Sequence, residues 1–186
     1  QSGAVLNFDV GYQTVAAKDA CICREFNLIH PVVQADLILS VGKLKTHCMT
    51  GLSGGVKNLF GCIPGLQKPQ MHYRFQNTGD FCSMLVDLAQ TVAPVLTIID
   101  AVDAMEGNGP SGGTVRHTGC LIASRSPFCL DLFLSRLIAL KPQQAPTVLH
   151  SIRRGLCPDD PSMLRVLNPD SLPLTRSRSS AGLPMP

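Results

Sequence analysis

The hydrophobic residues of this chain follow two patterns, short continuous runs and helical spacing. Short apolar runs that end in glycine or in polar residues are typical of buried strands. Such runs predict strands over residues 35–41, 95–100 and 119–124. Apolar residues that recur at intervals of three and four positions predict amphipathic helices. This spacing predicts helices over residues 80–93, 127–140 and 145–156.

The order of these elements favours an α/β fold. A strand, a helix, two strands and a further helix predict a mixed, mostly parallel sheet with helices on its faces. We expect residues 1–170 to form one α/β domain, and residues 171–186, which are rich in Ser, Pro and Arg, to form a tail. Residues 4–10 already resemble the interior of a domain. We therefore expect the chain to be the C-terminal portion of a larger domain.

The segment between Asp36 and Asp80 contains no acidic residue but many Lys, His and Gly residues. Cationic side chains together with flexible backbone N–H donors are what an anion-binding loop requires. If Ser53 caps a helix that follows it, the helix dipole adds positive potential near Gly54 and Gly55. The alternative is a basic surface loop whose counter-ions lie elsewhere in the fold. The basic residues of the segment are Lys43, Lys45, His47, Lys57, Lys68, His72 and Arg74.

Lys57 is the lysine of this segment that is best placed for chemistry. It lies in a helix-like stretch beside Asn58. Partial burial would lower the pKa of its amine and suit it to base or covalent chemistry.

Three carboxylates follow the strongest predicted strand, and a glycine-rich run comes directly after them. They are Asp100, Asp103 and Glu106, followed by residues 107–113. Ligands of open α/β sheets bind beyond the carboxyl ends of the strands, so this position favours a site. The carboxylates could bind a divalent metal or act as general acid and base. The alternative is an acidic turn that only caps and solubilises a loop.

Composition limits the class of protein. The chain has 186 residues, of which 45% are hydrophobic, and this length and composition predict one globular domain. A net charge of +3 is too small to indicate nucleic-acid binding, and no apolar run approaches the roughly 18 residues of a membrane span. We therefore expect neither a nucleic acid nor a membrane as partner.

The eight cysteines are scattered and include no Cys-x-x-Cys pair. Iron–sulfur clusters need closely spaced thiolates, so we expect no cluster to be held by this chain alone. Free thiols that pack as small hydrophobic residues predict a reducing, cytoplasmic location.

Four motifs in this chain resemble those of a known family. They are residues 43–47 (KLKTH), 55–62 (GVKNLFGC), 63–65 (IPG) and 104–113 (AMEGNGPSGG). They are similar to the signatures of the domain of unknown function 362 family, over roughly residues 35–140. The resemblance implies a full-length protein with a further N-terminal part and a ferredoxin-like module that carries two four-iron clusters. It thereby implies redox work, with the clusters held by a module that is absent from this chain.

The order of some residues is also similar to that of the lactate racemase family, which uses a nickel pincer cofactor. That resemblance implies that Lys57 attaches or binds the cofactor, that His72 ligates the metal and that His47 transfers protons. Six residues separate Lys57 from Pro64, a longer spacing than we expect for the racemases.

These observations leave three hypotheses for the function. The first is an enzyme domain that binds a small anionic ligand and works with an iron–sulfur module of the full-length protein. The second is a nickel-cofactor isomerase, and the third is a non-catalytic module that binds a ligand or a partner protein. The expected catalytic residues are Lys57, His47, His72 and Glu106. The expected cofactor-binding residues are Lys43, Lys45, Gly54, Gly55, Asn58 and Asn108. The expected metal ligands are Asp100 and His72.

We also expect association in solution. A chain that lacks part of its sheet would expose an apolar surface, and a second copy could bury it. The sequence therefore predicts a homo-oligomer.

Overall fold

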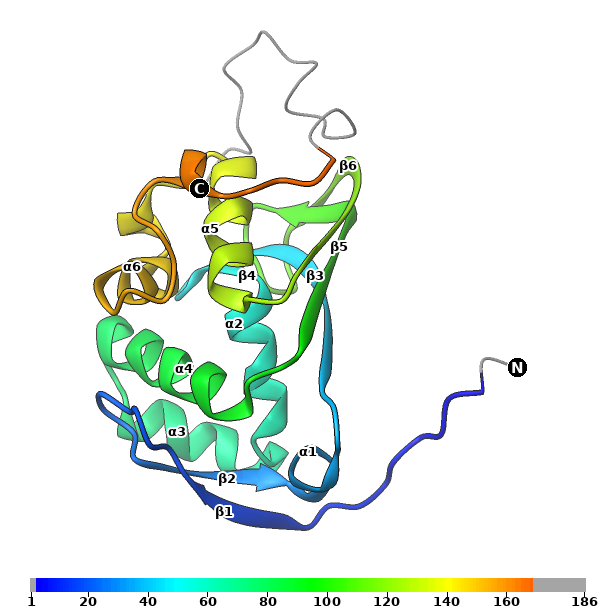
Figure 1. The fold of residues 1–186 in the computed structure, drawn as a ribbon, viewed down its shortest axis with the longest axis vertical. Helices are drawn as coiled ribbons and strands as arrows, with labels where there is room; N and C mark the ends of the chain where they lie inside the picture. Colours follow the sequence, from blue (N-terminus) through cyan, green and yellow to red (C-terminus); the bar gives the residue numbers. More distant parts are fainter. Residues whose placement is uncertain (1–2, 169–186) are drawn as a thin grey trace, which may run out of the picture.

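The computed structural model describes residues 3–168, so the predicted tail over residues 171–186 lies outside the described residues. Its main sheet has four strands in the spatial order β4-β3-β5-β6 (Figure 1). The strands are β3 (Leu39–His47), β4 (Gly51–Ser53), β5 (Leu96–Glu106) and β6 (Thr114–Ser124). The three predicted strands are thus present, and each is longer than, or displaced from, its predicted range.

The pairing directions correct one prediction. Only β3 and β5 run parallel, whereas β4 pairs antiparallel with β3 and β6 pairs antiparallel with β5. Strands that are joined by a short turn can pair only antiparallel, and residues 48–50 and 107–113 are such short connections. The predicted mixed α/β fold is therefore confirmed, but the prediction that the sheet is mostly parallel is wrong.

The three predicted helices are confirmed, with ends shifted by a few residues. They are α4 (Thr78–Val92), α5 (Pro127–Leu137) and α6 (Pro146–Arg153). Two short helices, α2 (Gly55–Asn58) and α3 (Lys68–Arg74), precede them. The 3₁₀ turns are η1 (Leu59–Cys62), η2 (Gly65–Gln67), η3 (Pro142–Gln144) and η4 (Pro161–Met163). None of the helices in the described residues is long and apolar enough to cross a bilayer.

The helices α2, α4 and α5 lie on the same side of the sheet (Figure 1). Leu44, Ile99 and Ala101 point to this side and are fully buried. The alternate residues of the same strands point the other way, because successive side chains of a strand alternate between its faces. Leu39 and Val41 on that second face are 62% and 65% exposed. We call this second face, with the outward residues of β3, β5 and β6, the open sheet face.

The N-terminal part forms a small sheet that the sequence patterns did not predict. β1 (Tyr12–Ala16) pairs antiparallel with β2 (Glu25–Ile29), and α1 (His30–Gln34) follows directly. In Figure 1 this small sheet lies below α3 and α4. Phe26 and Leu28 of β2 alternate with less buried neighbours and pack into the main core.

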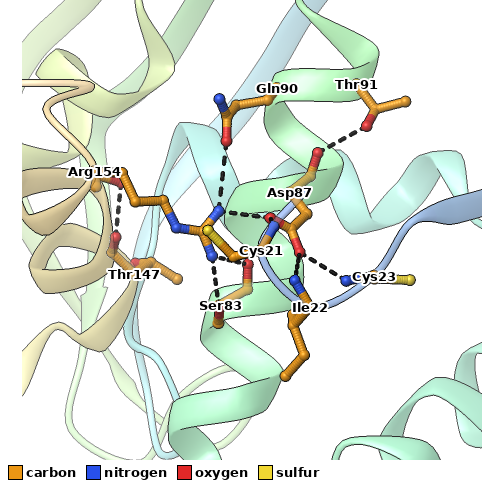
Figure 2. Close-up of polar contacts among 10 residues, drawn as sticks. Cys21, Ile22, Cys23, Ser83, Asp87, Gln90, Thr91, Thr147 and Arg154 are labelled. Atoms are coloured by element: carbon orange, nitrogen blue, oxygen red, sulfur yellow. Dashed lines mark hydrogen bonds and ion pairs between the residues drawn. The ribbon is translucent and has the colours of Figure 1, made fainter. Parts of the chain in front are cut away.

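A buried ion pair joins this N-terminal part to the last helices (Figure 2). Asp87 in α4 accepts hydrogen bonds of 2.9 Å from the backbone N–H groups of residues 21–23. The guanidinium of Arg154, just after α6, lies 2.6 Å from the same carboxylate and also donates to Ser83. A buried carboxylate needs several such donors to offset its lost hydration. We call this group the Asp87–Arg154 network.

Candidate functional site

The structure gathers three of the predicted catalytic residues from three different elements. Lys57 lies in α2, His47 is the last residue of β3, and His72 is in α3. Burial lowers the pKa of the His47 ring, and Lys57 and His72 are close enough to His47 to lower it further. We call these three side chains, together with Lys68, the basic cluster.

Two aromatic rings form the apolar surround of the basic cluster. The Nζ atom of Lys57 lies 4.6 Å from the centroid of the Phe60 ring. The His72 ring stacks on Phe81 with a centroid separation of 4.3 Å, and it meets Phe60 edge-on at 5.6 Å. A cation over a ring face is attracted by the ring quadrupole, so Phe60 helps to hold Lys57 in place.

No residue of the basic cluster takes part in an ion pair within the described residues. Burial, with Lys68 nearby, lowers the pKa of Lys57. Burial also lowers the pKa of His72, and Lys57 adds to this effect. Burial, with Lys57 and His72, lowers the pKa of His47 to about 4. The cluster thus holds several basic groups that lack an anionic partner in the part of the chain described.

The hydrogen bonds of His47 determine which nitrogen of its ring carries the proton. Its Nδ1 atom accepts from the backbone N–H groups of Met49 at 3.1 Å and Thr50 at 3.3 Å. The neutral ring therefore carries its proton on Nε2 and presents a hydrogen-bond donor there. This geometry suits His47 to bind an anion, and it does not suit the ring to accept a proton.

The predicted glycine loop is arranged differently from the expectation. Ser53 ends β4 and does not cap a helix; Gly54 is the residue that precedes α2. The backbone N–H groups of Gly55 and Val56 donate to the buried carboxylate of Asp131 in α5, at 2.6 and 3.1 Å. A Cβ atom at Gly54 would collide with the same carboxylate. The start of α2 is thus occupied by a side chain of the protein itself, so the predicted role of Ser53 is wrong.

Among the other predicted ligand-binding residues, Lys43 and Lys45 lie on β3, and Asn58 of α2 forms hydrogen bonds with it. Asn58 donates to the Ser40 hydroxyl and to the Val41 carbonyl, so its amide fastens α2 to β3. Lys43 points to the open sheet face and forms a 2.8 Å ion pair with Asp100. Lys45, two residues further along β3, is half-buried next to the end of β5.

The predicted acidic loop is mainly strand. Asp100, Asp103 and Glu106 all lie within β5, because β5 and β6 continue pairing up to Glu106 and Thr114. Glu106 lies 3.9 Å from Arg116 of β6 and makes no described ion pair with the basic cluster. Asn108 is exposed in the turn that follows.

The predicted metal ligands belong to different surroundings. Asp100 points to the open sheet face and is neutralised by Lys43, whereas His72 packs on Phe81 of α4. No group of three His, Cys, Asp or Glu residues that could hold a metal ion occurs in residues 3–168. Two cysteines near the cluster also do not offer thiolates, since burial raises the pKa of Cys62 to about 11 and that of Cys82 to about 12. The described residues therefore do not fit a nickel centre or an iron–sulfur cluster.

Three contributors to the site were missed by the sequence analysis. Phe60 follows Lys57 at the i+3 spacing of one helix face, a signal that was available in the sequence. Phe81 and Asp131 come from distant parts of the chain, and no local signal identifies them. A cavity of about 730 Å³ between β6, α5 and residues 164–168 contains none of the predicted site residues.

Comparisons with known proteins give a family and a relative. The model of the family described as Domain of unknown function (DUF362) matches residues 3–136. A thylakoid-associated protein from Synechocystis sp. is 38% identical over 143 residues, which are 76% of this chain and 44% of that protein. The chain thus spans less than half the length of this curated relative. No solved structure matches the chain.

Proposed function

Because the chain belongs to the domain of unknown function 362 family, we propose that it supplies the anion-binding site of an enzyme that works with an iron–sulfur module. The module would be part of a longer protein, as the resemblance to the family implies. The observation that carries the anion-binding role is the basic cluster itself, in which Lys57, Lys68 and two histidines lack anionic partners among the described residues.

The chemistry of the cluster suits a small anion. Several basic groups that depress one another's pKa values are stabilised by an added negative charge. The Nε2–H group of His47 offers a neutral donor beside the charged lysine, and the rings of Phe60 and Phe81 lie against Lys57 and His72. Hydrogen bonds that involve a charged partner are stronger than those between neutral groups.

Sulfate binding measured by isothermal titration calorimetry tests this proposal. Sulfate keeps its double charge across the neutral range and so probes the cluster alone. We expect Lys57→Met to weaken binding at least about tenfold, because a hydrogen bond to a charged group contributes about 1.5–3 kcal/mol. The matched control is Lys18→Met, which removes an exposed lysine that is distant from Lys57 in the sequence. Equal affinities of the two variants would contradict the proposal.

The cytoplasmic location remains a prediction of the cysteine pattern. The relative from Synechocystis is named as thylakoid-associated, and we propose no location for this chain from that name.

A further inference from the structure

The cavity beside β6 is separate from the basic cluster. It has a volume of about 730 Å³ and lies between β6, α5 and residues 164–168. In Figure 1 the last described residues pass over α5 and end beside β6. Sites for small molecules typically measure about 300–1,000 Å³, so the space is large enough for such a ligand. We call it the β6 cavity.

The lining of the β6 cavity is elongated. β6 contributes the consecutive residues 119–124, which extend over about 17 Å at roughly 3.4 Å per residue. Residues 164–168 supply a second continuous stretch of chain, and α5 supplies Cys129, Leu130 and Phe133. A lining of this length suits an extended ligand better than a compact one.

Most side chains around the β6 cavity are apolar. Leu130 is buried, Ile122, Phe133 and Leu164 are half-buried, and Leu167 is 82% exposed. Removal of such apolar surface from water is favourable and drives the binding of apolar molecules. The β6 cavity therefore favours a ligand with an apolar body.

The charged residues that line the β6 cavity are both arginines. Arg125 directly follows β6, and Arg165 follows η4 by two residues. No Asp or Glu lines the cavity, and neither guanidinium forms an ion pair or a hydrogen bond with another residue of the described chain. A guanidinium offers five N–H donors and pairs well with a carboxylate. The charge of the cavity is thus complementary to a ligand with one anionic group.

We propose that the β6 cavity binds a free fatty acid, that is, an unbranched alkyl chain with a terminal carboxylate. The alkyl chain lies against the apolar side chains of β6 and α5. The carboxylate accepts hydrogen bonds from Arg125 and Arg165. This site is distinct from the basic cluster, and the proposal does not depend on the anion-binding role of Lys57.

Titration calorimetry of the whole chain with decanoate tests the proposal. Decanoate should bind at least about fivefold more tightly than octanoate, because its two additional methylene groups are buried in the cavity. Octan-1-ol has the chain of octanoate without the charge, and it should bind more weakly than octanoate. Binding of decanoate that is no tighter than that of octanoate would overturn the proposal, as would the absence of binding.

Substitution of the arginines tests the role of the carboxylate. Arg125→Met and Arg165→Met should each weaken decanoate binding about tenfold, because each removes hydrogen bonds to a charged group. The matched control is Arg24→Met, which removes an exposed arginine that does not line the cavity. Equal affinities of the three variants would show that the arginines do not hold the ligand, and the proposal would be wrong.

The free cysteines show where decanoate binds. Cys129 lines the cavity and is half-buried, whereas Cys21 is exposed and lies outside it. Saturating decanoate should slow the alkylation of Cys129 by N-ethylmaleimide, measured by peptide mass mapping, and leave that of Cys21 unchanged. If decanoate binds without protecting Cys129, it binds elsewhere and the proposal is wrong. If a second copy of the chain fills the cavity instead, decanoate should not bind, and the proposal is again wrong.

Discussion

At the scale of single residues, the basic cluster couples anion binding to proton uptake. Lys57 and His72 have lowered pKa values because burial and neighbouring positive charge disfavour their charged forms. A bound dianion favours those charged forms and therefore raises the pKa values. Protons then bind together with the anion, and linkage requires the affinity to increase as the pH falls.

We therefore expect sulfate to bind more tightly at pH 6 than at pH 8. Titration calorimetry at several pH values, in buffers with different enthalpies of ionisation, measures both the affinity and the number of protons taken up. Net proton uptake should disappear in large part when Lys57 and His72 are both replaced by Met. An affinity that is independent of pH would contradict this account.

The sequence predicted the members of the cluster but not their protonation. Lys57, His47 and His72 share a segment without acids, so a common basic site could be inferred from composition alone. The tautomer of His47 depends on the turn at Met49 and Thr50, whose N–H groups occupy Nδ1. That turn exists only because β3 and β4 form a hairpin, which the sequence patterns did not reveal.

At the scale of elements, Asp131 fastens α2 to α5. Its carboxylate accepts the N–H groups of Gly55 and Val56, and burial raises its pKa to about 7. Val56 and Asp131 are 75 positions apart in the sequence, so no local pattern could predict this contact. The local sequence pattern instead predicted that Ser53 caps the helix that follows it. The position of Lys57 depends on this long-range contact, because α2 carries it.

Asp131→Asn is expected to change how the stability depends on pH. The folded protein holds a proton on Asp131 up to about pH 7, whereas the unfolded chain loses it near pH 4. This residue therefore contributes stability that is fully present below about pH 4 and is lost as the pH rises towards 7. Urea unfolding at several pH values gives the free energy of unfolding of the wild type and of Asp131→Asn. Between pH 4 and pH 7, the wild-type value should fall relative to that of the variant. Parallel pH profiles of the two proteins would contradict the assignment.

At the scale of the whole molecule, the helices of residues 3–168 cover the sheet on one side only. Leu39, Val41 and Leu121 on the open sheet face are each more than 60% exposed, around the ion pair of Lys43 and Asp100. An apolar surface of this kind marks an interaction site in soluble proteins. The sequence predicted an exposed apolar surface and helices on the faces of the sheet. It could not predict which face each helix covers, because helical periodicity does not specify that face.

We predict that the chain associates through the open sheet face. Light scattering should then give a mass above 19.9 kDa, the mass of one chain, and Leu121→Lys should reduce it. Leu66→Lys is the matched control, since Leu66 is a more exposed leucine outside this face. A monomeric mass for the wild-type chain would contradict the prediction.

The Asp87–Arg154 network also affects which parts of the chain can open independently. Residues 21–23 belong to no helix or strand, yet their three amides point at a carboxylate that Arg154 holds from the far end of the described chain. Neither end can detach without leaving a buried charge unpaired, so both should open in one cooperative step. In native-state hydrogen exchange, these loop amides should exchange as slowly as those in the middle of α4.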